Sequence, residues 1–107
     1  AITTGNNTAE RVSRGSSIYT MSKAAVATMV KGIALDLAPR GITVNNIEPG
    51  PTETDMTASM VSDLAAMVPI RRVGHGEDIA ELALYLAGPR SGYMTGSSLT
   101  IDGEFAL

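Results

Sequence analysis

A tyrosine and a lysine four positions apart, Tyr19 and Lys23, are the residues of this sequence best suited to acid–base chemistry. On a helix this spacing places both side chains on one face, one turn apart. A nearby ammonium group favours phenolate over phenol, so we expect Lys23 to lower the pKa of Tyr19 from its reference value of about 10. A tyrosine tuned in this way can pass a proton to or from an alcohol or carbonyl oxygen. The alternative is a Tyr–Lys pair on a solvated helix surface without a chemical role.

The helix that must carry this pair is predicted over residues 17–38. Apolar residues recur there at intervals of three and four positions, which is typical of an amphipathic helix; they are Val26, Met29, Val30, Ile33, Ala34 and Leu37. Pro39 and Gly41 then end the helix. The methionine and alanine side chains in this segment favour packing over ligand binding as their role.

Two β-prone segments flank this helix, at residues 1–5 and 41–47. The second is followed by Glu48-Pro49-Gly50-Pro51, and two prolines around a glycine predict a sharp, stiff loop just past the strand. Residues 6–16 are predicted to be a loop at the place where open α/β sheets bind ligands. The alternatives are an ordinary connecting loop at residues 6–16 and a turn followed by a capped helix after the prolines.

The second half of the sequence predicts two more helical segments. Residues 55–68 are rich in methionine and form either a mobile lid or a plain surface helix. Residues 70–76 are an extended connector, in which His75 is interpreted as a surface residue. Glu77 or Asp78 is expected to cap the last helix.

That last helix ends at Gly88 and Pro89, and a final strand follows over residues 98–102. Strands therefore alternate with helices along the chain. This alternation favours an α/β fold with a parallel sheet, in one unit that spans residues 1–107.

The composition argues against several classes of function. The 107 residues are 44% hydrophobic with a formal net charge of -3, and they lack a basic run interleaved with aromatic residues, so nucleic acid is not an expected partner. No apolar stretch approaches the length of about 20 residues that crosses a bilayer, so no membrane partner is expected. Cysteine is absent, which excludes disulfides and thiolate chemistry and is compatible with a cytoplasmic location. One histidine, His75, argues against a histidine-based metal site, and no metal is expected.

Four motifs, in matching order and spacing, resemble those of the short-chain dehydrogenase/reductase family. The segment from Tyr19 to Lys23 is similar to the YxxxK active-site motif of that family. Residues 39–45 resemble its PxGIxVN segment, and residues 49–56 its PGxxxTxM cofactor loop. Residues 93–96 and 101–103 are similar to its C-terminal Y(I/V)TG and (V/I)DG signature. The resemblance covers essentially the whole chain.

The resemblance implies the C-terminal half of a Rossmann-type, doubly wound parallel sheet. It implies an NAD(P)-dependent oxidoreductase that interconverts a small alcohol and a carbonyl. Tyr19 would be the acid/base at the carbonyl oxygen, and Lys23 would lower its pKa and hydrogen-bond the nicotinamide ribose. The loop residues that would bind the cofactor are Pro49, Gly50, Thr52 and Thr54. Of these, Thr52 would hold the carboxamide through its backbone and Thr54 through its hydroxyl. The protein contributes position and electrostatics to such chemistry.

The sequence departs from the family pattern at two places. Family members usually carry a serine thirteen positions before the tyrosine, where this chain has Asn6. An asparagine amide can still donate a hydrogen bond to the substrate oxygen, so Asn6 is the third candidate catalytic residue, with Thr4, Asn7 and Thr8 as stand-ins if the loop shifts. The glycine-rich turn that would bind the pyrophosphate has no counterpart in residues 1–107. We therefore expect the 107 residues alone to bind dinucleotide weakly or not at all.

Two other functions stay open on the same scaffold. One is a non-catalytic protein that binds a nucleotide ligand of the cyclic-di-GMP type, which Asn6 in the serine position would suit. The other is a structural remnant without activity. Family members commonly associate through the helix that carries the tyrosine, and residues 24–27, Met29 and Ile33 are consistent with a homo-oligomer, a dimer or a tetramer.

Overall fold

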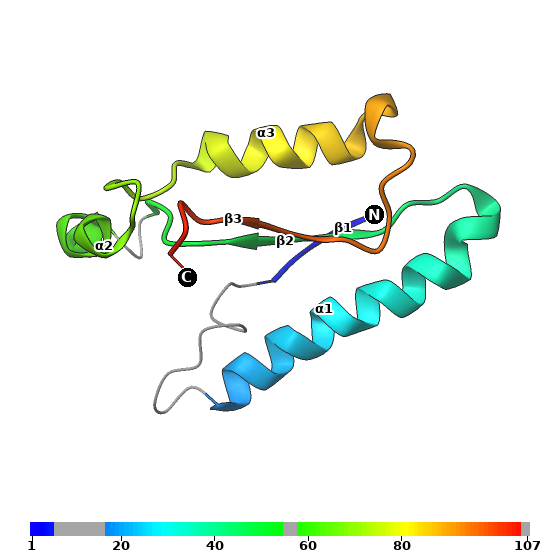
Figure 1. Ribbon diagram of the computed structural model, residues 1–107, viewed down its shortest axis with the longest axis horizontal. Coiled ribbons are helices and arrows are strands. Elements are labelled where there is room, and N and C mark those ends of the chain that lie inside the picture. The colour runs from blue at the N-terminus through cyan, green and yellow to red at the C-terminus, as the bar shows by residue number, and fades with distance from the viewer. Residues whose placement is uncertain (6–16, 55–57, 106–107) are drawn as a thin grey trace.

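The computed structural model of this protein describes residues 1–5, 17–54 and 58–105, and within them a parallel sheet lies between two helices (Figure 1). The strands lie in the order β1-β2-β3, and both pairs are parallel. Helix α1 lies on one side of the sheet and α3 on the other (Figure 1). The bounds are β1 Ile2–Thr4, α1 Ser17–Leu37, β2 Asn45–Pro49, α2 Val61–Met67, α3 Gly76–Ala87 and β3 Ser98–Ile101. The predicted α/β fold with a parallel sheet is therefore confirmed.

Helix α1 packs on the sheet through the apolar face that its sequence pattern predicts. Val30 and Ala34 of α1 are buried against Val44, which directly precedes β2. Ile33 and Leu37 pack against this cluster from the same helix. Positions 30, 33, 34 and 37 of the predicted pattern thus form the packed face of the helix, whereas Met29 is 54% exposed.

Strand β2 begins and ends later in the chain than the sequence predicts. The prediction was residues 41–47, whereas β2 spans Asn45–Pro49. Gly41 cannot start a strand because it ends the 3-10 helix η2 (Ala38–Arg40), with a left-handed φ of 71° and an N–H that donates to the Ala38 carbonyl oxygen at 2.9 Å. Pro49 stays in the strand because proline lacks only the N–H, and its fixed φ is compatible with an extended backbone.

Asn45 sets the position of the chain that enters β3. Its amide nitrogen donates to the Met94 carbonyl oxygen at 3.1 Å, and its side-chain oxygen accepts from the Ser97 N–H at 3.1 Å. Asn45 is buried, and these two hydrogen bonds satisfy both polar atoms of its side chain inside the fold. Through these bonds, the segment around Met94 helps to fix the register of β3 against β2.

The segment between β2 and α3 is helical in its described part. A 3-10 helix, η3 (Ala58–Met60), leads into α2, so the predicted helical segment is confirmed there, while residues 55–57 lie outside the described residues. In Figure 1, α2 lies at the end of the molecule toward which the carboxyl ends of β2 and β3 point. Val68, directly after α2, is buried and anchors this segment.

Helix α3 begins at Gly76, before the two residues that were predicted to cap it, Glu77 and Asp78. His75 is the N-cap residue, and its N–H donates to the Asp78 carboxylate at 2.8 Å, so Asp78 caps the helix from within its first turn. The helix ends at Ala87, one residue before Gly88. A 3-10 helix, η4 (Pro89–Ser91), follows. Among the described residues, no helix combines the length and the apolar character that a membrane span requires.

Candidate active site

Tyr19 and Lys23 lie one turn apart at the start of α1 and face each other. The Lys23 Nζ lies 5.8 Å from the centroid of the Tyr19 ring, which is within the range of a cation–π contact. Tyr19 is 48% exposed, so a ligand can reach the residue. The Ser22 hydroxyl donates to the Tyr19 carbonyl oxygen at 2.8 Å and so serves the helix backbone. The predicted juxtaposition of the phenol and the ammonium group is present.

The loop after β2 is fixed on one side by β3. The Gly50 N–H donates to the Ile101 carbonyl oxygen at 3.0 Å. A Cβ at Gly50 would lie 2.5 Å from the Asp102 Cβ and 2.7 Å from its Cα, so any larger residue would push the loop away from the strand. The close approach of two backbones, and not only the flanking prolines, therefore shapes this loop.

On its other side, the loop is paired with the connector before α3. The Gly74 N–H donates to the Pro51 carbonyl oxygen and the Glu53 N–H donates to the Gly74 carbonyl oxygen, both at 2.8 Å. These two hydrogen bonds form a parallel bridge between Thr52 and Gly74. The Thr52 hydroxyl donates to the Gly50 carbonyl oxygen at 2.9 Å, which braces the loop from within. The Thr52 side chain is therefore engaged within the loop itself.

The helix end that carries Tyr19 and Lys23 and the loop after β2 lie toward the same end of the molecule. Figure 1 shows the N-terminal end of α1 at the end toward which the three parallel strands point. Ligands of open α/β sheets bind at that end. Thr54 lies in the exposed part of the loop. Asn6, the third candidate catalytic residue, lies outside the described residues.

The connector next to the loop carries one ion pair and one histidine–carboxylate contact that sequence reasoning did not find. The Arg72 guanidinium lies 3.0 Å from the Asp78 carboxylate, and the His75 Nδ1 lies 3.5 Å from the Glu53 carboxylate. The hydrogen bond from Arg72, and then that from the His75 N–H, hold the pKa of Asp78 below its usual value. His75 is exposed, as predicted. Such contacts form where the chain turns back on itself, and they leave no periodic pattern in the sequence from which they could be predicted.

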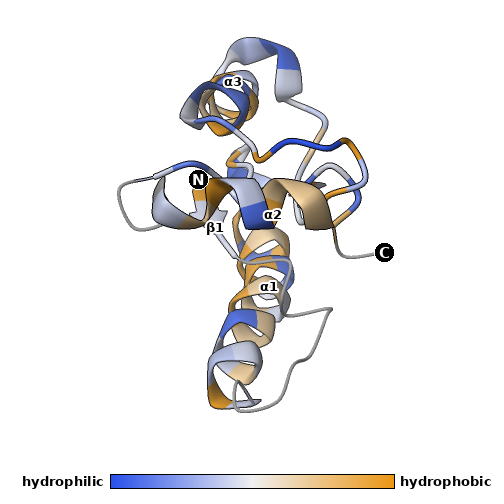
Figure 2. Ribbon diagram, turned by 90° about the vertical axis from the view of Figure 1, so that its left-hand side faces the viewer, coloured by the Kyte–Doolittle hydropathy of each residue, from blue (hydrophilic) through white to orange (hydrophobic). Residues whose placement is uncertain are grey.

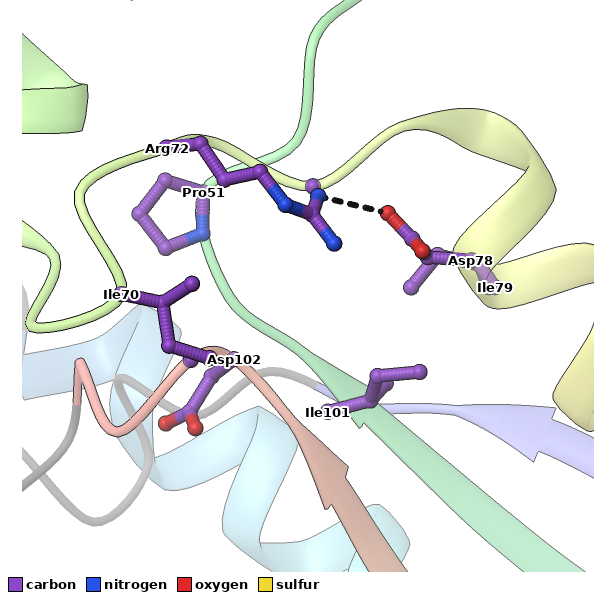
Figure 3. A pocket seen from close by; sticks show the side chains of 9 residues that line it. Pro51, Ile70, Arg72, Asp78, Ile79, Ile101 and Asp102 are labelled. Carbon is purple, nitrogen blue, oxygen red and sulfur yellow. Dashed lines mark hydrogen bonds and ion pairs between the residues drawn. The ribbon is translucent and has the colours of Figure 1, made fainter.

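A small pocket of about 130 Å³ lies between the loop, this connector and the end of β3. Figure 3 shows Pro51 and Ile70 on one side, Ile101 on another, and the Arg72–Asp78 pair at its edge. Its size suits packing or a few water molecules better than a dinucleotide.

Two buried polar residues of β2, Asn46 and Glu48, also escaped the sequence reasoning. A signal for them existed: a central parallel strand is normally apolar on both faces, and here two polar residues stand at alternate positions. Within the described residues, histidine and acidic side chains do not gather into a group that could hold a metal ion.

Comparisons with known proteins place these features in one family. A family model described as enoyl-(acyl carrier protein) reductase matches residues 1–105. The chain is 40% identical over 94 residues to the cyclic-di-GMP-binding biofilm dispersal mediator protein of Escherichia coli K12, covering 85% of this chain and 40% of that protein. It is 40% identical over 95 residues to a 3-oxoacyl-acyl-carrier-protein reductase of Chlamydia pneumoniae, covering 85% and 38%. The chain thus spans about two fifths of the length of these relatives.

Solved structures match the same extent of the fold. A short-chain dehydrogenase/reductase from Serratia marcescens superposes with a TM-score of 0.90 at 47% identity, covering 99% of this chain and 45% of that one. A blue fluorescent protein from a metagenomic library, solved with NADPH, matches with a TM-score of 0.90 at 42% identity, covering 99% and 44%. A 3-ketoacyl-(acyl-carrier-protein) reductase from Brucella melitensis, solved with NADH, matches with a TM-score of 0.89 at 26% identity, covering 99% and 43%.

Proposed function

Because this chain belongs to the short-chain dehydrogenase/reductase family, we propose that it carries the catalytic part of an NAD(P)-dependent oxidoreductase that interconverts an alcohol and a carbonyl. The observation that carries the proposal is the contact between the Tyr19 ring and the Lys23 ammonium group at 5.8 Å. The family relationship supplies the class of reaction, and this pair supplies the proton chemistry that the reaction needs.

In the direction of reduction, the Tyr19 hydroxyl donates its proton to the carbonyl oxygen of the substrate. The phenolate left behind is stabilised by the positive charge of Lys23, since a neighbouring cation favours the charged form of the phenol. A positioned acid of this kind contributes about 10²- to 10⁴-fold to a rate. The Asn6 amide donates a hydrogen bond to the same oxygen.

The groups of the pair and of the loop suit a nicotinamide dinucleotide. Lys23 offers three donors, which suit the ribose hydroxyls. The loop offers the backbone of Thr52 and the hydroxyl of Thr54 next to Pro49 and Gly50, which suits a planar carboxamide with both donors and acceptors. When bound, NAD(P)H supplies the hydride. The hydrogen-bond donors and acceptors that these groups offer support the assignment of NAD(P) as the cofactor.

The proposal is tested in the full-length protein that carries residues 1–107. With NADPH or NADH and a panel of carbonyl compounds, we expect turnover that Tyr19→Phe lowers by at least about 10²-fold. The matched control is Tyr93→Phe, because Tyr93 is fully exposed and lies between η4 and β3. Turnover by Tyr19→Phe close to that of the wild type would show that another group is the acid.

A second candidate function is binding of a nucleotide ligand without turnover. It is favoured by Asn6 in the position where family members usually carry serine, and by the similarity to the E. coli protein named for cyclic-di-GMP binding. Calorimetry of the full-length protein with cyclic dinucleotides, run beside the carbonyl assay, separates the two functions. Binding together with no turnover on any carbonyl compound would favour this second function.

We also propose that the full-length protein is a homo-oligomer that associates through α1. Figure 2 shows apolar residues along the length of this helix. Ile18, Met21 and Met29 are 77%, 65% and 54% exposed, respectively, which leaves apolar surface for a second copy to cover. Ile33, in contrast, packs against the core of its own chain. A monomer in sedimentation of the full-length protein would contradict this proposal.

A further inference from the structure

Five polar side chains from all three strands form a connected group near the carboxyl ends of β1 and β2, here named the strand-end cluster. The Thr3 hydroxyl donates to the Asn46 side-chain oxygen at 2.8 Å. The Asn46 amide nitrogen donates to a Glu48 oxygen at 3.4 Å and to the Ser98 hydroxyl at 3.3 Å. The Thr100 hydroxyl donates to the other Glu48 oxygen at 3.5 Å. The cluster therefore links β1, β2 and β3 through side chains, in addition to the backbone ladder.

The centre of this cluster is deeply buried. Asn46 is 0% and Glu48 3% exposed. Taking a carboxyl group and an amide out of water is costly, and apolar residues of similar size would pack at these positions at lower cost. This buried polar network therefore does not by itself indicate a gain in stability. It indicates instead that the strands it connects must be positioned precisely.

The end of β1 is fitted against this cluster. The Gly5 N–H donates to the Ile47 carbonyl oxygen at 2.6 Å. A Cβ at Gly5 would lie 2.8 Å from the Asn46 amide nitrogen and 3.3 Å from the Glu48 Cγ. The Asn46 and Glu48 side chains thus leave no room for a side chain at position 5, where the backbone approaches β2. Gly5 directly precedes Asn6, and Glu48 directly precedes Pro49.

We propose that Glu48, through Asn46, is a positioning residue that sets the end of β1 relative to the cofactor loop. The carboxylate accepts hydrogen bonds from β2 and β3, while its Cγ faces the space in which Gly5 lies. The Glu48 side chain thereby fixes the ends of two strands. These are the end of β1, which continues into Asn6, and the end of β2, where Glu48 is followed by Pro49. The inference rests on the proposed function, because these two ends carry a candidate catalytic residue and the candidate cofactor loop.

The test compares Glu48→Ala with Glu48→Gln in the full-length protein. Glu48→Ala removes both the acceptors and the Cγ, so we expect kcat to fall about 10- to 100-fold, with a smaller change in KM for the carbonyl compound. Glu48→Gln keeps the shape and one acceptor, and the Thr100 hydroxyl can accept from its new amide. We therefore expect this variant to stay within about threefold of the wild type, as a positional role requires. Glu81→Ala, which removes an exposed carboxylate of α3, is the matched control.

Hydrogen–deuterium exchange provides a readout that does not need activity. In Glu48→Ala we expect faster exchange at the Gly5 and Gly50 amides, whose hydrogen bonds to Ile47 and Ile101 lie on either side of Glu48. Amides within α3 should exchange as in the wild type. If Glu48→Ala does not fold, Thr100→Val removes one donor to the carboxylate at an exposed position and should produce the same changes at a smaller size.

The outcomes separate this inference from the proposed function. Unchanged exchange at Gly5 and Gly50 in both Glu48→Ala and Thr100→Val overturns the positioning role. Equal losses of activity in Glu48→Gln and Glu48→Ala also overturn it, since they would show that the charge and not the position matters. If the wild type reduces no carbonyl compound, the proposed function fails, and the exchange measurement alone decides whether Glu48 sets the two chain ends.

Discussion

The two halves of the candidate site are built in different ways. The Tyr19–Lys23 pair is made within one helix, by a spacing of four residues. The cofactor loop is made by residues far apart in the chain, since Gly50 is bonded to Ile101 and Pro51 to Gly74. The helix half therefore depends on local geometry, whereas the loop half depends on the packing of β3 and the connector.

This difference predicts how each half responds to substitution. A change at the helix pair should alter the chemistry and leave the fold intact, because Tyr19 is exposed and Lys23 is only half-buried. A change at the loop should alter stability and cofactor binding together, because the same backbone contacts serve both. The predictions below test this contrast, from the largest expected effect to the smallest.

Lys23→Ala should lower turnover without unfolding the protein. Loss of the ammonium group removes the positive charge beside Tyr19, so alcohol oxidation should be about 10- to 100-fold slower near neutrality. Initial rates of alcohol oxidation by the full-length protein measure this loss. Lys31→Ala, two turns further along α1 at an exposed position, is the control and should leave the rate unchanged.

Gly50→Ala should lower both stability and cofactor affinity. Its Cβ would overlap the Asp102 Cβ, and such overpacking costs about 1–3 kcal/mol. Urea unfolding and cofactor titration of the full-length protein measure the two effects.

Gly32→Ala is the matched control for this loop variant. Nothing lies within 4 Å of a Cβ at this helical position, so the change should stabilise the protein by about 0.5–1 kcal/mol. Equal behaviour of the two glycine variants would contradict the account of a packed loop.

Asn6→Ser should raise kcat by about two- to tenfold, since a serine hydroxyl is the donor that family members usually place against the substrate oxygen. Initial rates of carbonyl reduction measure it. A fall in kcat would mean that the segment after β1 acts in another way, and would favour the binding function over turnover.

Asp78→Asn should produce a small loss of stability that depends on pH. The hydrogen bonds from Arg72 and from the His75 N–H depress the pKa of the folded carboxyl group, so its contribution is present at neutral pH. It is lost as the pH falls below about 4, through the folded pKa. The difference in Tm between wild type and variant should therefore narrow in acid. In an Arg72→Ala background the same substitution should have a smaller effect.

Sequence reasoning succeeded where neighbours along the chain decide the outcome. The Tyr19–Lys23 contact, the end of α1 near Pro39 and the capping by Asp78 all follow from contacts within a few residues. It failed at β2, whose predicted start at Gly41 ignored the role of that glycine in ending a helix. It also placed Pro49 in the loop past the strand, whereas Pro49 is the last residue of β2, a place that only the missing N–H of proline disfavours.

The sequence by itself determined the α/β class, the contact between Tyr19 and Lys23 and the family. Local spacing and ordered motifs specify these, because helix geometry and turn chemistry act over a few residues. The tertiary structure alone decided that Gly50 must approach Asp102, that Gly74 pairs with the loop, and that Asn46 and Glu48 are buried next to Gly5. The contact partners of these residues lie up to about half the chain away, and only the packing of three strands brings them within hydrogen-bonding distance.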